Sequence, residues 1–429
     1  MLGSVCLVVA GSSGVRACPG MKRWQHWSRQ WYGLKWSGFL QEAAIFFADG
    51  RSEVPYDRTE ESAMVPWLKQ VYGITGAIHN RRYYLYMPIT IKIKSMLASF
   101  LRVIGVSAWK LARYPNEHCA ILMYHRVLPK IEQRRWVQAG MVVEPETLDL
   151  HIRYLRKNFQ IVPLSTLATL HERPPRALRE KPLCILTFDD GWYDFYKYAY
   201  PILKMNEAPA TVFLPTDFIG TGKWFWSDRV GRLLDRMPCS LSTVKDNSGY
   251  HDPFVRQVVK MKGTFESRLE RVMALLKQYR VEQIEEMLSK LAALVGENAQ
   301  AVDRAFVSWE EVREMSGSGL ISFGSHTAGH PIMTTLTENE ARHELRKSMD
   351  SLVLNKAVDT AFIPFCYPNG SYSESLSGMV RDAGYHLAVT TQDGWNNPGG
   401  NPYLLRRIAI HQDMTSTEAM LEARIVNLL

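Results

Sequence analysis

The chain has 429 residues, of which 46% are hydrophobic and 22% are charged, a composition that is typical of folded proteins and a length that is large for one domain. The formal net charge of +8 favours anionic partners, but no nucleic-acid-binding motif occurs and the basic residues are spread out, so we expect no nucleic-acid partner. The six cysteines contain no C-x-x-C pair, which excludes a zinc ribbon and a disulfide framework, and no apolar run is long enough to span a membrane.

Residues 1–86 keep neither a helical nor a strand period for long, and we interpret them as a loosely ordered N-terminal extension. The opening apolar stretch has no basic residue ahead of it, which makes it a weak secretion signal. We therefore expect a protein that is cytoplasmic or peripheral to the inner membrane, with export left open as an alternative.

Residues 87–114 are apolar and basic and contain no acidic residue. Met96, Phe100 and Ile104 recur at helical spacing, so this segment is predicted to be a basic amphipathic helix. Such a helix either packs on its own domain or lies on an anionic membrane face, and a peripheral membrane contact is therefore one interpretation.

In residues 115–429 short apolar strands alternate with helices, which predicts a parallel sheet. About seven such units suit a barrel better than a small open sheet. Strands are expected in "CAILMYHRV", "QIVPL", "LCILTFDDG", "PATVFLPTDFIG", "ISFGSHTAGHP", "AFIPFCYPNG", "YHLAVTT" and "LLRRIAIH". Residues 222–304 hold no convincing strand, and we expect a helical insertion there, over the carboxyl end of the barrel.

Chemically active side chains follow the expected strands. Asp189 and Asp190 close one strand, and two adjacent carboxylates raise the pKa of at least one of them unless a cation is near. His326 and His330 follow another strand, and in a helical turn their spacing would place both imidazoles on one side. Two imidazoles and one carboxylate suit zinc or another divalent transition metal.

Further polar and aromatic residues are expected at the same end of the barrel. They are His125, Trp224, Trp226, Trp395, Arg406, Arg407 and His411. The first of these histidines either lines the pocket or is a hydrogen-bonded structural residue. The three tryptophans lie in loops, where their rings either stack on sugar faces or pack in the core.

The motifs "LTFDDG", "SHTAGHP" and "FCYPNG", in this order, resemble the first three motifs of the polysaccharide deacetylases, the NodB-homology family or carbohydrate esterase family 4. "AILMYHRV" and "RYLRKNFQIVPLSTL" resemble the lead-in of the bacterial exopolysaccharide branch of that family. The resemblance covers about residues 119–414 and implies a distorted (β/α)7 barrel. It also implies a metal-dependent hydrolase that removes N-acetyl groups from a polysaccharide or oligosaccharide containing N-acetylhexosamine.

The resemblance further implies a role for each matching residue. The ligands of one divalent metal ion, zinc or else cobalt or nickel, become Asp190, His326 and His330. Asp189 becomes the general base that deprotonates metal-bound water as it attacks the amide carbonyl. The oxyanion would be held by the metal and by a backbone N–H near Asn369, and Tyr367 belongs to the expected substrate contacts.

Two departures from the family pattern leave other interpretations open. The family commonly has an Arg, which orients the base, where this chain has Cys366, and we interpret this cysteine as inert packing. Arg407 is the candidate replacement, since strand alternation points Arg406 to the other face. His411 stands near the family's general-acid histidine, and its alternative is a surface histidine. A carbohydrate-binding or scaffold protein with impaired catalysis, and an amidase acting on a non-sugar amide, therefore stay open.

Overall fold

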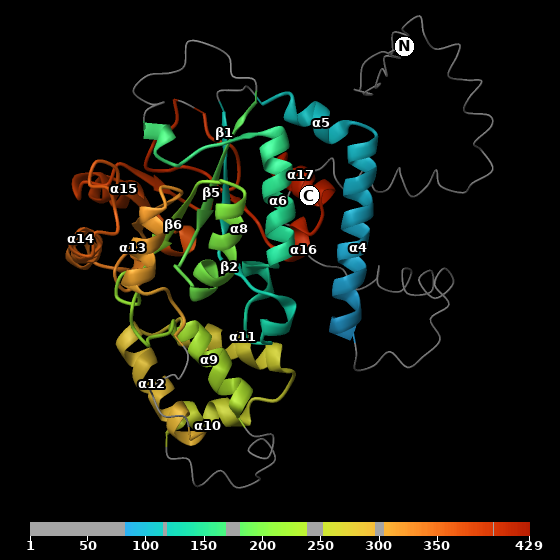
Figure 1. Ribbon diagram of the computed structural model, residues 1–429. Helices are drawn as coiled ribbons and strands as arrows, with labels where there is room; N and C mark the ends of the chain where they lie inside the picture. Colours follow the sequence, from blue (N-terminus) through green and yellow to red (C-terminus); the bar gives the residue numbers. More distant parts are fainter. Residues whose placement is uncertain (1–81, 115–117, 169–180, 238–251, 297–303, 398) are drawn as a thin grey trace, which may run out of the picture. The chain divides into compact units, whose positions relative to one another are not determined.

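The computed structural model describes residues 82–114, 118–168, 181–237, 252–296, 304–397 and 399–429 (Figure 1). Residues 1–81, which make up most of the expected N-terminal extension, lie outside the described residues. The helices are α4 Arg82–Val103, α5 Val106–Leu111, α6 Pro145–Asn158, α8 Tyr200–Met205, α9 Trp226–Arg236, α10 Pro253–Lys260, α11 Phe265–Leu276, α12 Val281–Leu294, α13 Trp309–Gly317, α14 Glu338–Leu354, α15 Glu374–Asp382, α16 Gln412–Thr415 and α17 Glu418–Ile425. The strands are β1 Cys119–Tyr124, β2 Arg126–Val127, β3 Val142–Val143, β4 Gln160–Ile161, β5 Leu183–Phe188, β6 Ala210–Leu214, β7 Ile321–Ser325, β8 Pro364–Cys366, β9 Leu387–Val389 and β10 Ile408–Ala409.

The main sheet is parallel, and its strands follow the order β10-β1-β5-β6-β7-β8-β9, with β4 beside the start of β5. The two edges of this path meet through one segment of the chain. Leu405 bridges Val389 of β9, and three residues later the same segment forms β10 beside β1. The seven strands therefore curl into an irregular barrel with helices around it, and the expected distorted (β/α)7 fold is confirmed.

Alternate side chains of β5 enter two different cores. Leu186 and Phe188 pack in a cluster with residues of the surrounding helices, whereas Leu183 and Ile185 belong to the cluster inside the barrel. Successive side chains of a strand point to opposite faces, so the next inward position after residue 187 is Asp189. The pleat of a buried strand thus delivers a carboxylate to the inside of the barrel at its carboxyl end.

The described residues between 222 and 304 form α9, α10, α11 and α12 and contain no strand. These helices share an apolar cluster that is separate from the barrel core and includes Val230, Val258, Val272 and Leu288. Residues 238–251 and 297–303 of this segment lie outside the described residues. The expected helical insertion is therefore present in the described part of this segment.

The segment over residues 87–114 differs from the single helix that we expected. It holds α4, which begins earlier, at Arg82, and the short α5, which begins at Val106. Gly105 between them has a φ of 78°, a left-handed conformation that glycine adopts readily and that ends a helix. α4 packs along α17, near the end of the chain (Figure 1).

A buried histidine ties α6 to the residues before α17. His151 donates through Nε2 to the carbonyl of Thr415 at 2.6 Å, which leaves Nδ1 to accept from the Tyr124 hydroxyl at 3.1 Å. Burial lowers the pKa of His151 to about 4, although the bond to the carbonyl opposes this shift. The ring is therefore neutral at pH 7, with both of its nitrogens bonded.

Candidate active site

Buried polar side chains gather at the carboxyl end of the barrel. Asp189 and Asp190 follow β5, His326 follows β7 and Cys366 ends β8. Arg407 directly precedes β10, in the segment that joins the two edges of the sheet. All five side chains are buried, and because the strands are parallel their ends meet at the same place.

Asp190, His326 and His330 form one group. Oδ1 of Asp190 lies 3.5 Å from Nε2 of His326 and 3.4 Å from Nε2 of His330. The three atoms that could hold a metal all lie within 4.8 Å of one another. One carboxylate and two imidazoles at this spacing are a ligand set for zinc or a similar divalent transition metal.

Two neighbours orient this group. His326 donates from Nδ1 to the carbonyl of Cys366 at 2.9 Å, which directs its Nε2 toward Asp190. Trp192 donates from Nε1 to Oδ2 of Asp190 at 2.9 Å, so Oδ1 is the carboxylate oxygen that faces the imidazoles. The ring orientation and the donor types therefore fit a metal ion, and these three residues form a candidate metal site.

The two histidines do not lie in a helical turn, so the helical reason for their convergence is wrong. Residues 326–330 form an irregular loop after β7, in which Thr327 and His330 have φ values of 64° and 58°. Left-handed residues turn the chain sharply, and this turn brings the imidazole of His330 back toward that of His326. Their ring centroids are 4.7 Å apart.

Asp190 also has a left-handed backbone, with a φ of 75°, and Gly191 follows with a φ of 64°. A Cβ at Gly191 would lie 2.5 Å from a methyl carbon of Leu214, so only glycine fits this turn without displacing the core. The sequence D-D-G thus ends the strand with a tight turn that aims two neighbouring carboxylates at different partners.

Asp189 is paired with Arg407. Nη1 donates to one carboxylate oxygen at 2.6 Å and Nη2 to the other at 2.7 Å. The other bonds of the guanidinium go to the carbonyl of Thr390 at 2.8 Å, to the hydroxyl of Thr187 at 3.3 Å and to the sulfur of Cys366 at 3.2 Å. Since a guanidinium has five N–H donors, all of them are used, and the two-point contact fixes the plane of the carboxylate.

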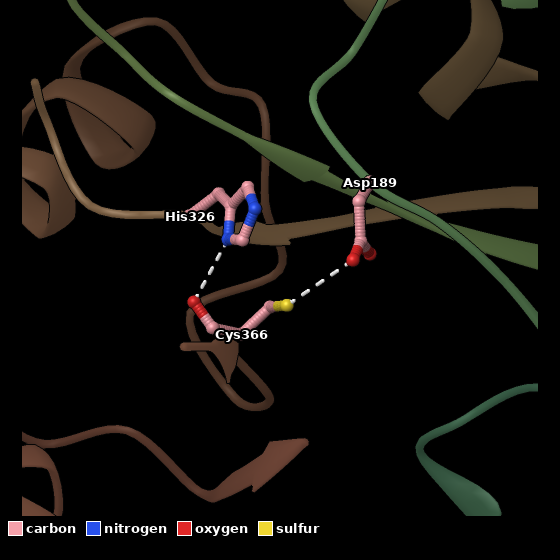
Figure 2. Close-up of side chains that lie close together, drawn as sticks. All are labelled: Asp189, His326 and Cys366. Carbon is pink, nitrogen blue, oxygen red and sulfur yellow. Dashed lines mark hydrogen bonds between the residues drawn. The ribbon is translucent and has the colours of Figure 1, made fainter. Parts of the chain in front are cut away.

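Cys366 lies between Asp189 and His326. Figure 2 shows its carbonyl bonded to His326 and its sulfur facing Asp189, at 3.6 Å from Oδ2. Burial raises the pKa of the thiol, so the sulfur is protonated and its S–H donates to the carboxylate. These three residues are close enough to hold a metal by spacing alone, but Arg407 already neutralises Asp189, and a second cation would be repelled.

Charges decide the protonation states of the site. Burial alone would raise the pKa of Asp189, but the Arg407 guanidinium outweighs it and lowers that pKa below its ordinary value. The pKa of Asp190 is also lowered, because its hydrogen bond with His326 and the nearby ring of His330 outweigh burial. The neighbouring Cys366 and Asp190 raise the pKa of His326 above its ordinary value, although burial opposes this shift. Burial and the neighbouring His326 lower the pKa of His330 to about 4. Both carboxylates are therefore ionised at neutral pH, and each has its own cationic or imidazole partner.

Three of the remaining predicted residues lie as follows. His125 lies beside Asp189, with its Nε2 at 3.8 Å from Oδ2 of that carboxylate. His411 precedes α16 as its N-cap, and its Nδ1 contacts the carboxylate of Asp413. Arg406 is directed away from Asp189 and donates to the carbonyl of Asp393 at 3.1 Å.

The loop after β8 separates two residues that we expected to touch substrate. Asn369 is exposed and has a φ of 56°. Tyr367 is buried, its hydroxyl donates to the carbonyl of Tyr403 at 3.2 Å, and its N–H donates to the carbonyl of Val389 at 3.2 Å. The polar groups of Tyr367 are thus bonded inside the protein, and its expected substrate contact stays a prediction.

The tryptophans occupy different surroundings. Trp224 is partly buried, with the ring of Trp136 at 5.8 Å and the guanidinium of Arg232 at 4.3 Å from its own ring centroid. Trp226 begins α9 and packs against the cluster of the insertion. Both stand after β6, at the end of the barrel where the site lies.

The expected position of Trp395 on the active face is wrong. The next residue, Asn396, pairs with Cys119, which is the first residue of β1 and lies at the amino-terminal end of the barrel. Trp395 donates from Nε1 to the carbonyl of Ile425 at 2.9 Å, and its ring stacks on Tyr114 at 4.1 Å. A long loop carries the chain from the end of β9 back to the opposite end of the barrel, and a loop of that length hid the reversal from the sequence.

Three residues that contact the group of Asp190, His326 and His330, or the loop that holds it, were not predicted from the sequence. Trp192 bonds Asp190, and Phe225 stacks on the imidazole of His330 with ring centroids 4.4 Å apart. Glu344 of α14 accepts the N–H groups of residues 328 and 329 at 3.0 and 2.8 Å, and so holds the loop between the two histidines. The position of Trp192, two residues after Asp190, could have suggested its contact, whereas no local pattern marks Glu344.

A parallel barrel carries a carboxylate, two imidazoles and a second, separately held carboxylate at its carboxyl end, an arrangement that suits a hydrolase with a candidate metal site. Residues 177–240 and 262–388 match a protein-family model, that of the polysaccharide deacetylases. YxkH of Bacillus subtilis (strain 168), which is named as a polysaccharide deacetylase, is 22% identical over 316 residues, which are 72% of this chain and 77% of YxkH. Residues 177–240 and 262–388 therefore carry a polysaccharide deacetylase domain, and this similarity supports a hydrolase that deacetylates a polysaccharide.

Two solved structures are similar to the chain. The deacetylase PplD of Streptococcus pyogenes, in complex with acetate, gives a TM-score of 0.46 at 20% identity, with 73% of this chain and 99% of PplD covered. IcaB of Ammonifex degensii gives a TM-score of 0.45 at 18% identity, with 72% of this chain and 98% of IcaB covered.

Proposed function

We propose that this protein is a metal-dependent hydrolase that removes N-acetyl groups from a polysaccharide or oligosaccharide containing N-acetylhexosamine. The observation that carries the proposal is the pairing of two different acidic groups at one end of the barrel. Asp190 faces two imidazoles at 3.5 and 3.4 Å, and Asp189 is held by a guanidinium at 2.6 and 2.7 Å. Hydrolysis of an amide needs both an electrophilic centre and a base, and these two groups supply one each.

Asp190, His326 and His330 would hold one divalent ion, for which zinc is the first candidate and cobalt or nickel are the alternatives. Such an ion polarises the amide carbonyl and lowers the pKa of water from about 15.7 toward about 7. The protein's part is to direct both Nε2 atoms toward the ion. The bond from His326 Nδ1 to a carbonyl fixes the orientation of that ring, and binding of the ion would displace the proton from its Nε2.

Asp189 acts as the general base. The guanidinium of Arg407 keeps it ionised and fixes its plane, so a lone pair is available for the proton of the attacking water. Arg407 takes the orienting role that the family commonly gives to the residue at position 366, and it acts through Asp189 as a positioning residue. His125, at 3.8 Å from the same carboxylate, borders the space that the water would occupy.

Residues at the rim of the site would stabilise the oxyanion and protonate the leaving amine. The exposed turn at Asn369 offers a backbone N–H for the developing oxyanion. His411 would protonate the leaving amine, since Asp413 fixes its ring through Nδ1 and leaves Nε2 for a transferable proton. The site residues thus comprise a base, an oxyanion donor and an acid, with the two histidines and Asp190 reserved for the ion.

The test is acetate release from N-acetylglucosamine oligomers and from extracted exopolysaccharide, with the metal removed and then restored. We expect Asp190→Ala with His326→Ala to lose bound metal, and Asp189→Asn to keep metal but to release no acetate. Metal-free protein that stays inert to added zinc, cobalt and nickel would overturn the proposal and favour a carbohydrate-binding protein. Release from simple amides but from no sugar would favour an amidase.

A further inference from the structure

One face of α4 packs against α17. Ala98 is buried against the apolar residues of α17. Arg102 pairs with Glu418 at 2.9 Å and with Glu422 at 3.1 Å, both on α17, and Lys110 of α5 donates to the carbonyl of Asn427 at 2.7 Å. These contacts fix the rotation of α4 about its own axis, so the opposite face of the helix is turned outward in a defined way.

The outward face of α4 is apolar, which reverses the usual arrangement of a surface helix. The first four of its residues follow one another at intervals of three or four positions, and the fifth lies four positions after the third, so they line up along the helix. We call these residues the outer stripe; they and their exposed fractions are Ile93 at 55%, Met96 at 72%, Phe100 at 49%, Val103 at 85% and Ile104 at 53%. Single exposed apolar residues are common, but a continuous row of five marks a surface that binds something.

The charged residues of the segment that carries the outer stripe are all basic. Residues 82–114 contain six Lys and Arg and no Asp or Glu. Lys92 lies beside the stripe and is exposed, and Arg113 is exposed over the ring of Trp109, which is itself 57% exposed. The two acidic residues of α17 that α4 meets are already paired with Arg102. An occupant of this face must therefore be apolar in its interior and anionic at its surface.

We propose that the outer stripe lies on an anionic lipid surface, with α4 parallel to the membrane plane. Apolar side chains would enter the boundary between headgroups and acyl chains, and Lys92 and Arg113 would stay among the anionic headgroups. The helix lies on the membrane and does not cross it, since no helix in the described ranges is long and apolar enough to span one. The proposal rests on α4 and α5 alone and is independent of the reaction at the barrel.

Charge argues against the two other occupants. A second copy of this chain would bring the same six positive charges against their counterparts, and like charges repel. Residues 1–81 of the same chain carry nine Lys and Arg against six Asp and Glu, so their net charge is also positive. Only the lipid surface combines an apolar layer with negative charge.

The test is flotation of the full chain with vesicles of phosphatidylcholine that contain or lack phosphatidylglycerol. We expect association with the anionic vesicles only. A triple variant, Ile93→Asn, Met96→Asn and Phe100→Asn, should weaken it at least about tenfold. The matched control is a second triple variant, Ile131→Asn, Met205→Asn and Leu354→Asn, and it should leave association unchanged. These three apolar residues lie outside the stripe, and their exposed fractions are 87%, 68% and 82%. Lys92→Gln and Arg113→Gln should each weaken association about fivefold.

Equal circular dichroism spectra and equal acetate release would show that the variants are folded. Failure of the parent chain to float with anionic vesicles, or equal flotation of the stripe variant, would overturn the proposal. A dimer that the stripe variant abolishes would instead identify a second copy as the occupant. An environment-sensitive dye on a Met96→Cys variant, with the labelled parent as the blank, should shift its emission only on addition of vesicles. A dye that is already shielded in buffer would show that the chain itself covers the stripe.

Discussion

Replacing Arg407 by Met tests whether this residue holds the base. The change keeps the apolar length of the side chain but removes all five bonds of the guanidinium, and Asp189 stays buried without its two-point partner. Removing one partner of a buried ion pair costs about 3–5 kcal/mol of unfolding free energy. We therefore expect urea unfolding at pH 7 to show a loss of this size for Arg407→Met.

The size of this loss should depend on pH. The pKa of Asp189 is lowered in the folded protein, so the pair stabilises the fold above the unfolded pKa of about 3.9, and this contribution is lost as the pH falls through the folded pKa. In Arg407→Met, burial is unopposed and raises the pKa of Asp189, so a protonated, neutral carboxyl replaces the buried charge in acid. The difference in stability between the parent and the variant should therefore shrink as the pH falls from 7 toward 4.

The same substitution should affect kcat more than KM. Loss of a well-placed general base lowers the rate by about a hundredfold to ten-thousandfold, and we expect Arg407→Met to fall in that range with metal content unchanged. Arg407→Lys is the matched control, because it keeps the charge but not the two-point contact, and it should lie between the parent and the Met variant. A double-mutant cycle with Asp189→Asn should be strongly non-additive. Additive losses, or a raised KM with unchanged kcat, would refute the positioning role.

Three further predictions concern the scaffold. The pKa of His151 is about 4 in the folded protein and about 6.5 in the unfolded chain, so the unfolded chain binds a proton first as the pH falls. The free energy of unfolding, measured with urea, should therefore fall by about 2 kcal/mol between pH 7 and 5. In His151→Met this part of the pH dependence should be absent. At Gly370, where φ is 69°, a Cβ would lie 1.9 Å from a threonine hydroxyl, so Gly370→Ala should lower the free energy of unfolding by about 2 kcal/mol or more in urea unfolding. The control is Gly378→Ala in α15, where a Cβ meets nothing within 4 Å, and it should be neutral or stabilising in the same assay. Glu344→Ala frees the loop between His326 and His330, the proposed metal ligands. It should weaken zinc affinity about tenfold to a hundredfold in competition titrations, whereas Glu338→Ala, at the exposed start of the same helix, should not.

The sequence predicted the elements whose signals are local. The six-residue apolar run before Asp189 is a strand that is buried along its whole length, and the alternation of strands and helices correctly predicted the barrel. Strand alternation also favoured Arg407 over Arg406 as the partner of the base, and the structure places the first at Asp189 and the second at a distant carbonyl. The catalytic roles of these residues stay predictions, since geometry alone does not measure a rate.

The features that the sequence could not predict depend on contacts between distant segments. The spacing of His326 and His330 suggested a helical turn, whereas the backbone is irregular and is held by Glu344 of a different element. Trp395 was assigned to the wrong end of the barrel, because a loop hides where the chain reverses. The apolar spacing in α4 predicted a helix with one apolar face, but only the ion pairs of Arg102 decide that this face points outward.

The relation between Cys366 and Arg407 shows why a changed motif need not mean a changed site. In a parallel barrel the ends of all strands converge, so a guanidinium can reach the same carboxylate from more than one strand. Here it comes from the segment that joins the two edges of the sheet, and it passes 3.2 Å from the sulfur of Cys366. A second guanidinium at position 366 would meet the first one in a space where only one carboxylate is available to neutralise it. The small thiol at position 366 and the arginine at position 407 therefore complement each other. Asp189 stays ionised because one of these two positions, and only one, carries a guanidinium.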